Sequence, residues 1–203
     1  TISIGDINQD GFNDVLSGSI LNELSWYENN ATGTFIKNTI AADLSGITGI
    51  FITDLDQDSN NDILTSLRYD NQIIAWINDG NENFTRDTID NNLNRAEDVA
   101  AIDLDGDQDV DIISIGWQIA DLYWYENDGN FNFTKHLING ALFGATNIHL
   151  VDIENDNDMD ILVAAQTRDE ISIWINDGQA SFTKIVIDDD LNNASGVYAD
   201  DIN

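Results

Sequence analysis

The sequence predicts an all-β protein of four successive four-stranded antiparallel repeats, each about 49 residues long, followed by the start of a fifth. Three markers recur in fixed order and support this prediction: an acidic Asp-Ile or Asp-Leu start, a Trp-centred segment and a Phe-containing segment. The acidic marker begins at residues 6, 54, 103, 152 and 201, so its steps are 48, 49, 49 and 49 residues. Four-stranded units repeating at this period are typical of β-propeller blades.

The other two markers follow the same period. They are Trp26, Trp76, Trp124 and Trp174, and then Phe35, Phe84, Phe133 and Phe182. Short runs rich in Ile, Val, Leu and Thr separate the markers and are bounded by Asn, Asp and Gly, which is the pattern of short strands. We therefore expect a single propeller, or part of one, with blades at about 1–46, 47–95, 96–144 and 145–196, and with 197–203 beginning a further blade strand.

The second repeat illustrates the order of the elements, named A to D. Strand A is expected at residues 49–53, strand B at 62–67, strand C at 73–77 and strand D at 83–89, with an Asn78-Asp79-Gly80 turn joining C to D. No apolar period of 3.6 residues persists for more than about two turns, so almost no helix is expected. The recurring Trp on strand C is expected to pack between blades rather than to bind a ligand.

The composition excludes several classes of partner. The formal charge of -31 arises from 38 acidic and 7 basic residues, whereas nucleic acids and anionic membranes require clustered Lys and Arg. With 42% hydrophobic residues and five Trp, the chain is not of the disordered type. No apolar run approaches the length of a membrane-spanning helix, and the N-terminus lacks the features of a signal peptide.

The chain has no Cys, so it contains neither disulfides nor thiolate metal sites. A hard cation held by oxygen ligands is the remaining way to neutralise and stabilise such an acidic domain, and calcium fits best. Weak oxygen-ligand calcium sites are typical of extracellular modules, so we expect a secreted or cell-surface location.

A nine-residue acidic loop lies between strands A and B of every repeat, with oxygen-bearing side chains at positions 1, 3, 5 and 9. Position 7 is expected to contribute its backbone carbonyl, so that four Ca²⁺ ions are expected, about one per repeat. The candidate ligands are Asp6, Asn8, Asp10, Phe12 and Asp14; Asp54, Asp56, Asp58, Asn60 and Asp62; Asp103, Asp105, Asp107, Asp109 and Asp111; and Asp152, Glu154, Asp156, Asp158 and Asp160.

The simpler alternative is that Asp and Asn occur here because they favour turns, but four such loops in register argue for metal binding. The loop is not an EF-hand, which requires a bidentate Glu at position 12 and a following helix. Position 6 is expected to be left-handed, and only the first loop has Gly there (Gly11), whereas the others have Ser59, Gln108 and Asn157. The four sites are therefore expected to differ.

These residues resemble the FG-GAP and VCBS repeat family, whose calcium-binding propeller repeats occur in integrin α-subunit heads and in many secreted bacterial proteins. The family loop Asp-x-Asp-x-Asp-Gly-x-x-Asp before an apolar strand is matched by residues 6–15, 54–63, 103–112 and 152–161, with departures at Ser59, Gln108 and Glu154. The Trp-Tyr-Glu-Asn-Asp-Gly segment resembles the bacterial branch, which implies a bacterial origin.

The resemblance also implies a closed ring of seven or eight blades, whereas this sequence contains four full periods and the start of a fifth loop. We therefore expect a fragment of a larger array or of a longer precursor. Four blades could close alone, remain open, join missing blades in a larger ring or pair as a homodimer, and uncovered outer blades favour self-association.

In a propeller the B–C and D–A connections lie on the face opposite the acidic loops, and a protein or glycan partner is expected there. The candidate residues on that face are Arg68, Tyr69, Arg95, Trp117, Phe143 and Arg168. Trp117 has no counterpart in the other repeats, and an exposed Trp near Arg suits protein or carbohydrate recognition, although local packing is an equal alternative.

The function expected is therefore non-catalytic recognition or adhesion, with calcium as a structural ion. His136 and His149 have no obvious partner in the sequence, and the repeated carboxylates are explained by metal binding, so an enzyme is not expected. Two alternatives remain: part of a catalytic propeller, such as a polysaccharide lyase or hydrolase, and a structural spacer of a large surface protein.

Overall fold

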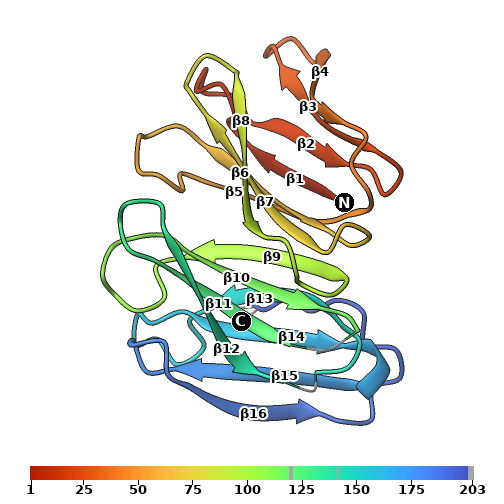
Figure 1. The fold of residues 1–203 in the computed structure, drawn as a ribbon, viewed down its shortest axis with the longest axis vertical. Coiled ribbons are helices and arrows are strands. Elements are labelled where there is room, and N and C mark those ends of the chain that lie inside the picture. The colour runs from red at the N-terminus through yellow and green to blue at the C-terminus, as the bar shows by residue number, and fades with distance from the viewer. Residues whose placement is uncertain (119–120, 141, 201–203) are drawn as a thin grey trace. The chain divides into compact units, whose positions relative to one another are not determined.

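The computed structural model describes residues 1–118, 121–140 and 142–200. The described residues form four antiparallel sheets of four strands each, and the strands of each sheet follow one another in chain order (Figure 1). One 3₁₀ turn, η1 (Gln166–Arg168), is the helical element among them. The all-β prediction, with almost no helix, is confirmed.

The first sheet contains β1 (Ile2–Gly5), β2 (Asp14–Gly18), β3 (Glu23–Asn29) and β4 (Phe35–Ala42). The second contains β5 (Ile47–Thr53), β6 (Asp62–Leu67), β7 (Gln72–Asn78) and β8 (Phe84–Asp90). The third contains β9 (Ala96–Ile102), β10 (Asp111–Gly116), β11 (Leu122–Asn127) and β12 (Phe133–Asn139). The fourth contains β13 (Ala145–Val151), β14 (Asp160–Ala165), β15 (Glu170–Asn176) and β16 (Phe182–Asp188).

The strands predicted for the second repeat differ from the observed ones by at most two residues at either end. The expected further strand at 197–203 is not tested: residues 197–200 form no strand, and 201–203 lie outside the described residues. The chain divides into two compact units, Thr1–Val99 and Ala100–Asn203.

Burial differs between the strands of a sheet and follows the polarity of their sequences. Strand B is buried at every position in β6, β10 and β14, and each of these strands is a continuous run of apolar and small residues after its first Asp. Strand D is the most exposed, because charged and polar side chains occur along it, as in β8 and β12. Strand D lies at one edge of each sheet, and strand A lies at the other.

In the first unit, a single apolar core joins the first two sheets. Trp26 and Trp76 lie in it with Ile47, Ile50 and Leu67. Gly18 of β2 is needed here, since a Cβ at this position would collide with Ile47. Because Trp26 and Trp76 lie in the core that joins the two sheets, the predicted packing between sheets is confirmed for them. Trp174 is almost fully buried and Trp124 is half-buried.

Candidate metal loops

Each acidic loop connects strands A and B of its sheet, and position 9 is the first residue of strand B. The backbone has a positive φ at position 6 in all four loops, as predicted: Gly11 (88°), Ser59 (76°), Gln108 (78°) and Asn157 (76°). Position 4 is also left-handed, which the sequence did not indicate: Gln9 (60°), Gln57 (61°), Gly106 (81°) and Asn155 (58°). The alternation curls each loop tightly.

Backbone amides within the loop hold its carboxylates in place. The position 6 N–H donates to Oδ2 of the position 1 aspartate in every loop, at 2.9 Å from Gly11 to Asp6 and at 3.0 Å in the other three. The position 7 N–H donates to Oδ1 of position 5 at 2.8–3.1 Å. Each oxygen retains a free lone pair, so these bonds orient the carboxylates without using up their capacity for a cation.

The position 9 aspartate links the loop to strand C. The four aspartates, Asp14, Asp62, Asp111 and Asp160, are fully buried. One carboxylate oxygen accepts the N–H of loop position 2 at 2.9–3.1 Å, and the other accepts the N–H of the Asn that ends strand C at 2.8–2.9 Å. This buried aspartate thus fixes one end of the loop to the interior of the sheet.

The loops concentrate negative charge. Carboxylate oxygens of Asp54, Asp56 and Asp58 lie within 4.8 Å of one another, as do those of Asp103, Asp105 and Asp111. Burial raises the pKa of Asp62 and of Asp111 to about 6, and burial followed by repulsion from neighbouring carboxylates raises the pKa of Asp105. Oδ1 of Asp54 is buried and has no hydrogen-bond partner. A hard cation would satisfy this oxygen and relieve the repulsion.

The side chain at position 7 lies against the C–D turn of the same sheet rather than inside the loop. Asn60, Asp109 and Asp158 contact Gly80, Gly129 and Gly178 respectively, and a Cβ at any of these glycines would collide with them. In the first loop Phe12 is 45% exposed. This placement leaves the backbone carbonyl of position 7 as its available ligand and puts the A–B and C–D connections on one face.

The Asn that ends strand C also joins neighbouring sheets, a role that the sequence analysis missed. Nδ2 of Asn78 donates to the carbonyl of Ile7 at 3.1 Å, and Nδ2 of Asn176 donates to the carbonyl of Leu104 at 2.8 Å. Both carbonyls belong to position 2 of the preceding acidic loop. The recurrence of Asn at residues 29, 78, 127 and 176 was the available signal.

The residues predicted for the opposite face do lie on B–C turns and D–A segments, but two of them are engaged in ion pairs. In the first unit, Nε of Arg68 donates to Oε2 of Glu97 at 2.8 Å, and Tyr69 is 58% exposed beside Gly46. The N–H of Arg95 donates to Asn71 at 2.8 Å.

In the second unit, Trp117 is half-buried, and its carbonyl accepts the N–H of Gly144 at 3.1 Å. The neighbouring Phe143 is 51% exposed. Nε of Arg168 lies 3.4 Å from Oε2 of the buried Glu170. Trp117 and Phe143 are therefore brought close to one another, whereas Arg168 is held by its own ion pair.

Both histidines have partners, which corrects the expectation from the sequence. Nε2 of His136 lies 2.8 Å from Oε2 of Glu126, and its ring stacks on Trp124 with 4.7 Å between centroids. His149 lies 3.2 Å from the carbonyl of Ala199 and packs against Tyr198. The sequence could not reveal these contacts because strand register and the path of the chain after residue 194 determine them.

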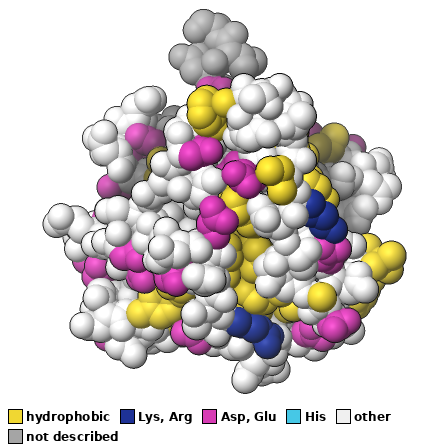
Figure 2. Space-filling model, turned by 90° about the horizontal axis from the view of Figure 1, so that it is seen from above, with side chains coloured by type: hydrophobic (Ala, Val, Ile, Leu, Met, Phe, Trp, Pro, Cys, Tyr) yellow, Lys and Arg dark blue, Asp and Glu magenta, His cyan; other side chains and the backbone are white. Residues whose placement is uncertain are grey.

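Acidic side chains recur across the face shown in Figure 2, where Lys and Arg are few.

Among the described residues, no helix has the length and apolar character needed to cross a bilayer.

Comparisons with known proteins identify the repeat. The model of the FG-GAP-like repeat matches residues 6–65, 54–114 and 103–163. No curated protein sequence matches.

Several solved structures share the fold. A lectin of Agrocybe aegerita, described as specifically recognising non-reducing terminal N-acetylglucosamine, superposes with a TM-score of 0.64 at 18% identity, over 93% of this chain and 52% of the lectin. An auxiliary nutrient binding protein from Bacteroides ovatus gives 0.59 at 10% identity, over 89% and 46%. A protein from Lactobacillus plantarum gives 0.57 at 13% identity, over 86% and 51%. The chain thus spans about half the length of these proteins.

Proposed function

The chain belongs to the FG-GAP-like repeat family, and from this premise we propose that it is an extracellular β-propeller recognition module whose loops bind structural calcium. The observation that carries the proposal is the recurrence of one loop geometry in four sheets: three loop positions with oxygen side chains, held by backbone amides, above a buried aspartate. A similar arrangement repeated in every sheet suits a structural ion, whereas a catalytic centre is normally asymmetric.

The choice of calcium follows from the donor set. The loops offer carboxylate, amide and backbone carbonyl oxygens, which are the ligands of hard cations, and the chain has no Cys to favour softer metals. Magnesium requires stricter octahedral geometry and retains its water more firmly, whereas calcium accepts six to eight oxygens at varied angles. The loops differ in their ligands, as with Glu154 at position 3, so their affinities are expected to differ.

The extracellular location rests on the same chemistry. Loops of this kind with exposed carboxylates suit the roughly 10⁻⁴–10⁻³ M dissociation constants of extracellular calcium modules. Recognition as the task draws support from two of the structural neighbours, one a lectin and one a nutrient binding protein. This chain spans about half of each neighbour. Recognition of a partner by the whole protein is therefore part of the proposal.

Isothermal titration calorimetry tests the metal sites. We expect Ca²⁺ to bind the metal-free protein at pH 7 with a total of four ions per chain and Mg²⁺ to bind more weakly. A variant with Asp54→Asn and Asp56→Asn should lose one ion, whereas Asp87→Asn, an exposed change on β8, should retain all four. Failure of the wild-type protein to bind Ca²⁺, or equal binding of Mg²⁺, would contradict the proposal.

A further inference from the structure

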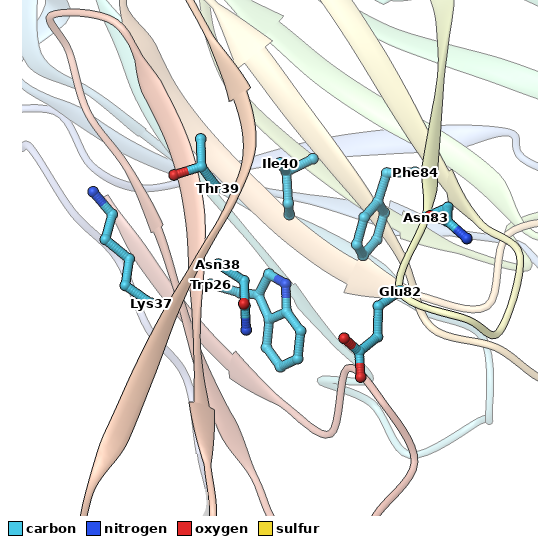
Figure 3. A pocket seen from close by; sticks show the side chains of 8 residues that line it. All are labelled: Trp26, Lys37, Asn38, Thr39, Ile40, Glu82, Asn83 and Phe84. Atoms are coloured by element: carbon cyan, nitrogen blue, oxygen red, sulfur yellow. The ribbon is translucent and has the colours of Figure 1, made fainter.

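A cavity of about 480 Å³ opens between the outer strands of the first two sheets. It is lined by β3 and β4 of the first sheet, and by β8 and the C–D turn of the second (Figure 3). Its volume lies within the range of roughly 300–1,000 Å³ that is typical of small-molecule sites. All of its lining residues belong to the first compact unit.

A short side chain, Asn38, lines the cavity at a position where the other three sheets have longer ones. Strand D places a residue directly opposite the recurring Trp of strand C: Asn38, Arg86, His136 and Lys184 in the four sheets. His136 stacks on Trp124, and the Nζ of Lys184 lies 5.4 Å from the ring of Trp174. Asn38 is too short to cover the space beside Trp26 in this way, so the space stays open.

The polar groups of the cavity are not fully used by the protein. Nδ2 of Asn38 is buried and has no hydrogen-bond partner. Glu82 is exposed and makes no described hydrogen bond or ion pair, and Figure 3 shows its carboxylate directed toward the space beside Trp26. A buried donor without a partner is uncommon in folded proteins, and here it stands beside an open space.

Apolar surface completes the site. The half-buried Phe84 and Ile40 face the same space, and Trp26 closes its base. The neighbouring Lys37 and Thr39 point away, because Nζ of Lys37 lies 2.7 Å from Oε1 of Glu23 and the Thr39 hydroxyl donates to the same oxygen. The free groups include one amide donor, on Asn38, and one carboxylate acceptor, on Glu82, beside an aromatic wall.

We propose that this cavity, bounded by Asn38, Ile40, Glu82 and Phe84, binds one sugar residue of a neutral glycan. Sugar hydroxyls can both donate to Glu82 and accept from Asn38, and the C–H face of a sugar ring can pack on Phe84. The free carboxylate and the overall charge of -31 disfavour sialylated, sulfated or uronate ligands. The inference rests on the proposed recognition function and locates it at the outer edge, not on the face predicted from sequence.

The test compares wild-type protein with two variants on an array of neutral oligosaccharides and their sialylated counterparts, in calcium-containing buffer. Asn38→Arg copies the residue of the second sheet and fills the cavity. Glu82→Ala copies Ala180 at the equivalent turn position of the fourth sheet and removes the acceptor. Asn92→Arg and Asp87→Ala make the same changes in charge at exposed positions outside the cavity.

We expect wild-type protein to bind neutral glycans, both cavity variants to weaken this binding by about tenfold or more, and both controls to stay within about twofold. Unchanged melting temperatures in calcium establish that the variants fold. If Asn38→Arg does not fold, Glu82→Ala alone tests the cavity. Binding that survives in both variants overturns the cavity assignment while leaving the recognition function intact. Preference for sialylated glycans, or no binding of wild-type protein to any neutral glycan, overturns the glycan assignment, and the calcium titration reports separately on the proposed metal sites.

Discussion

At the end of each acidic loop, one fully buried aspartate accepts a backbone N–H from the loop and another from strand C, as Asp160 does from Ile153 at 3.0 Å and from Asn176 at 2.9 Å. Removing this carboxylate would leave the buried N–H of Asn176 and the partly buried N–H of Ile153 without acceptors. An unpaired buried group costs about 1–3 kcal/mol.

Asp160→Ala should therefore lower the free energy of unfolding by about 1–4 kcal/mol even without metal, since the buried N–H of Asn176 carries the full penalty and the partly buried N–H of Ile153 carries part of it. Urea unfolding in chelator measures the change. Asp189→Ala is the matched control, because Asp189 is exposed and makes no described hydrogen bond. Equal unfolding midpoints for the two variants would show that the buried carboxylate has no structural role of its own.

The pKa values of Asp62 and Asp111 predict a pH dependence. Burial raises both to about 6, whereas an aspartate in an unfolded chain titrates near about 3.9. Between these values the folded state binds more protons than the unfolded state, so the stability of the metal-free protein falls as pH rises. In chelator the melting temperature should be higher at pH 5 than at pH 7.

The double variant Asp62→Asn, Asp111→Asn is the control for this prediction. Amides do not titrate, so the contribution of these two residues to the pH dependence of the melting temperature disappears. Bound calcium favours the ionised carboxylates, so calcium affinity should instead fall as pH drops below about 6. A melting temperature in chelator that rises from pH 5 to pH 7 is the result that would refute the assignment.

The sequence predicted where the acidic loops lie and the left-handed backbone at position 6, but not the hydrogen bonds that each loop residue makes. The left-handed backbone at position 6 was expected because Gly11 occupies it in the first loop. At position 4 the same conformation occurs at Gln9 and Gln57, and glutamine is not a residue type that indicates a positive φ. The two backbone hydrogen bonds that Asp62 accepts were also not predicted. A sequence does not distinguish an aspartate that could bind a metal from one that accepts backbone amides.

At the scale of the strands, the Asn that ends strand C couples one sheet to the loop of the preceding one. Nδ2 of Asn176 donates to the carbonyl of Leu104 at 2.8 Å, and both residues are almost fully buried. Asn176→Ala removes this bond and leaves the carbonyl of Leu104 unpaired.

We expect Asn176→Ala to destabilise the protein by about 1–3 kcal/mol and to increase amide hydrogen exchange in the acidic loop at 103–111. Asn81→Ala is a suitable comparison, because within the described part of the chain its exposed side chain donates a hydrogen bond to Asp79 of its own turn and to no other residue. Unchanged exchange in that loop would mean that the sheets are coupled through apolar packing alone.

Strand positions were predictable because local markers recur in every repeat: the acidic loop between strands A and B, the Trp of strand C and the Phe that begins strand D. Contacts between sheets were not predictable in this way. The cavity beside Trp26 depends on how Glu82 and Phe84 of one sheet approach Asn38 of another. The repeat pattern in the sequence does not predict how closely two sheets approach.

At the scale of the whole chain, a charge of -31 is the dominant physical fact. Most of it lies in repeated loops and turns, and self-repulsion of this size destabilises a compact state unless cations neutralise it. If the loops bind calcium as proposed, calcium is a ligand of folding, because an ion held by the loops of the folded state stabilises that state relative to the unfolded chain.

Thermal unfolding with calcium and then with excess chelator is the most direct test of this account. At free calcium about 100-fold above the dissociation constant, each site adds about 2.7 kcal/mol, so even one occupied site should raise the melting temperature by about 5–10 °C, and four should raise it further. Equal melting temperatures in calcium and chelator would contradict the account and identify the acidic loops as ordinary turns.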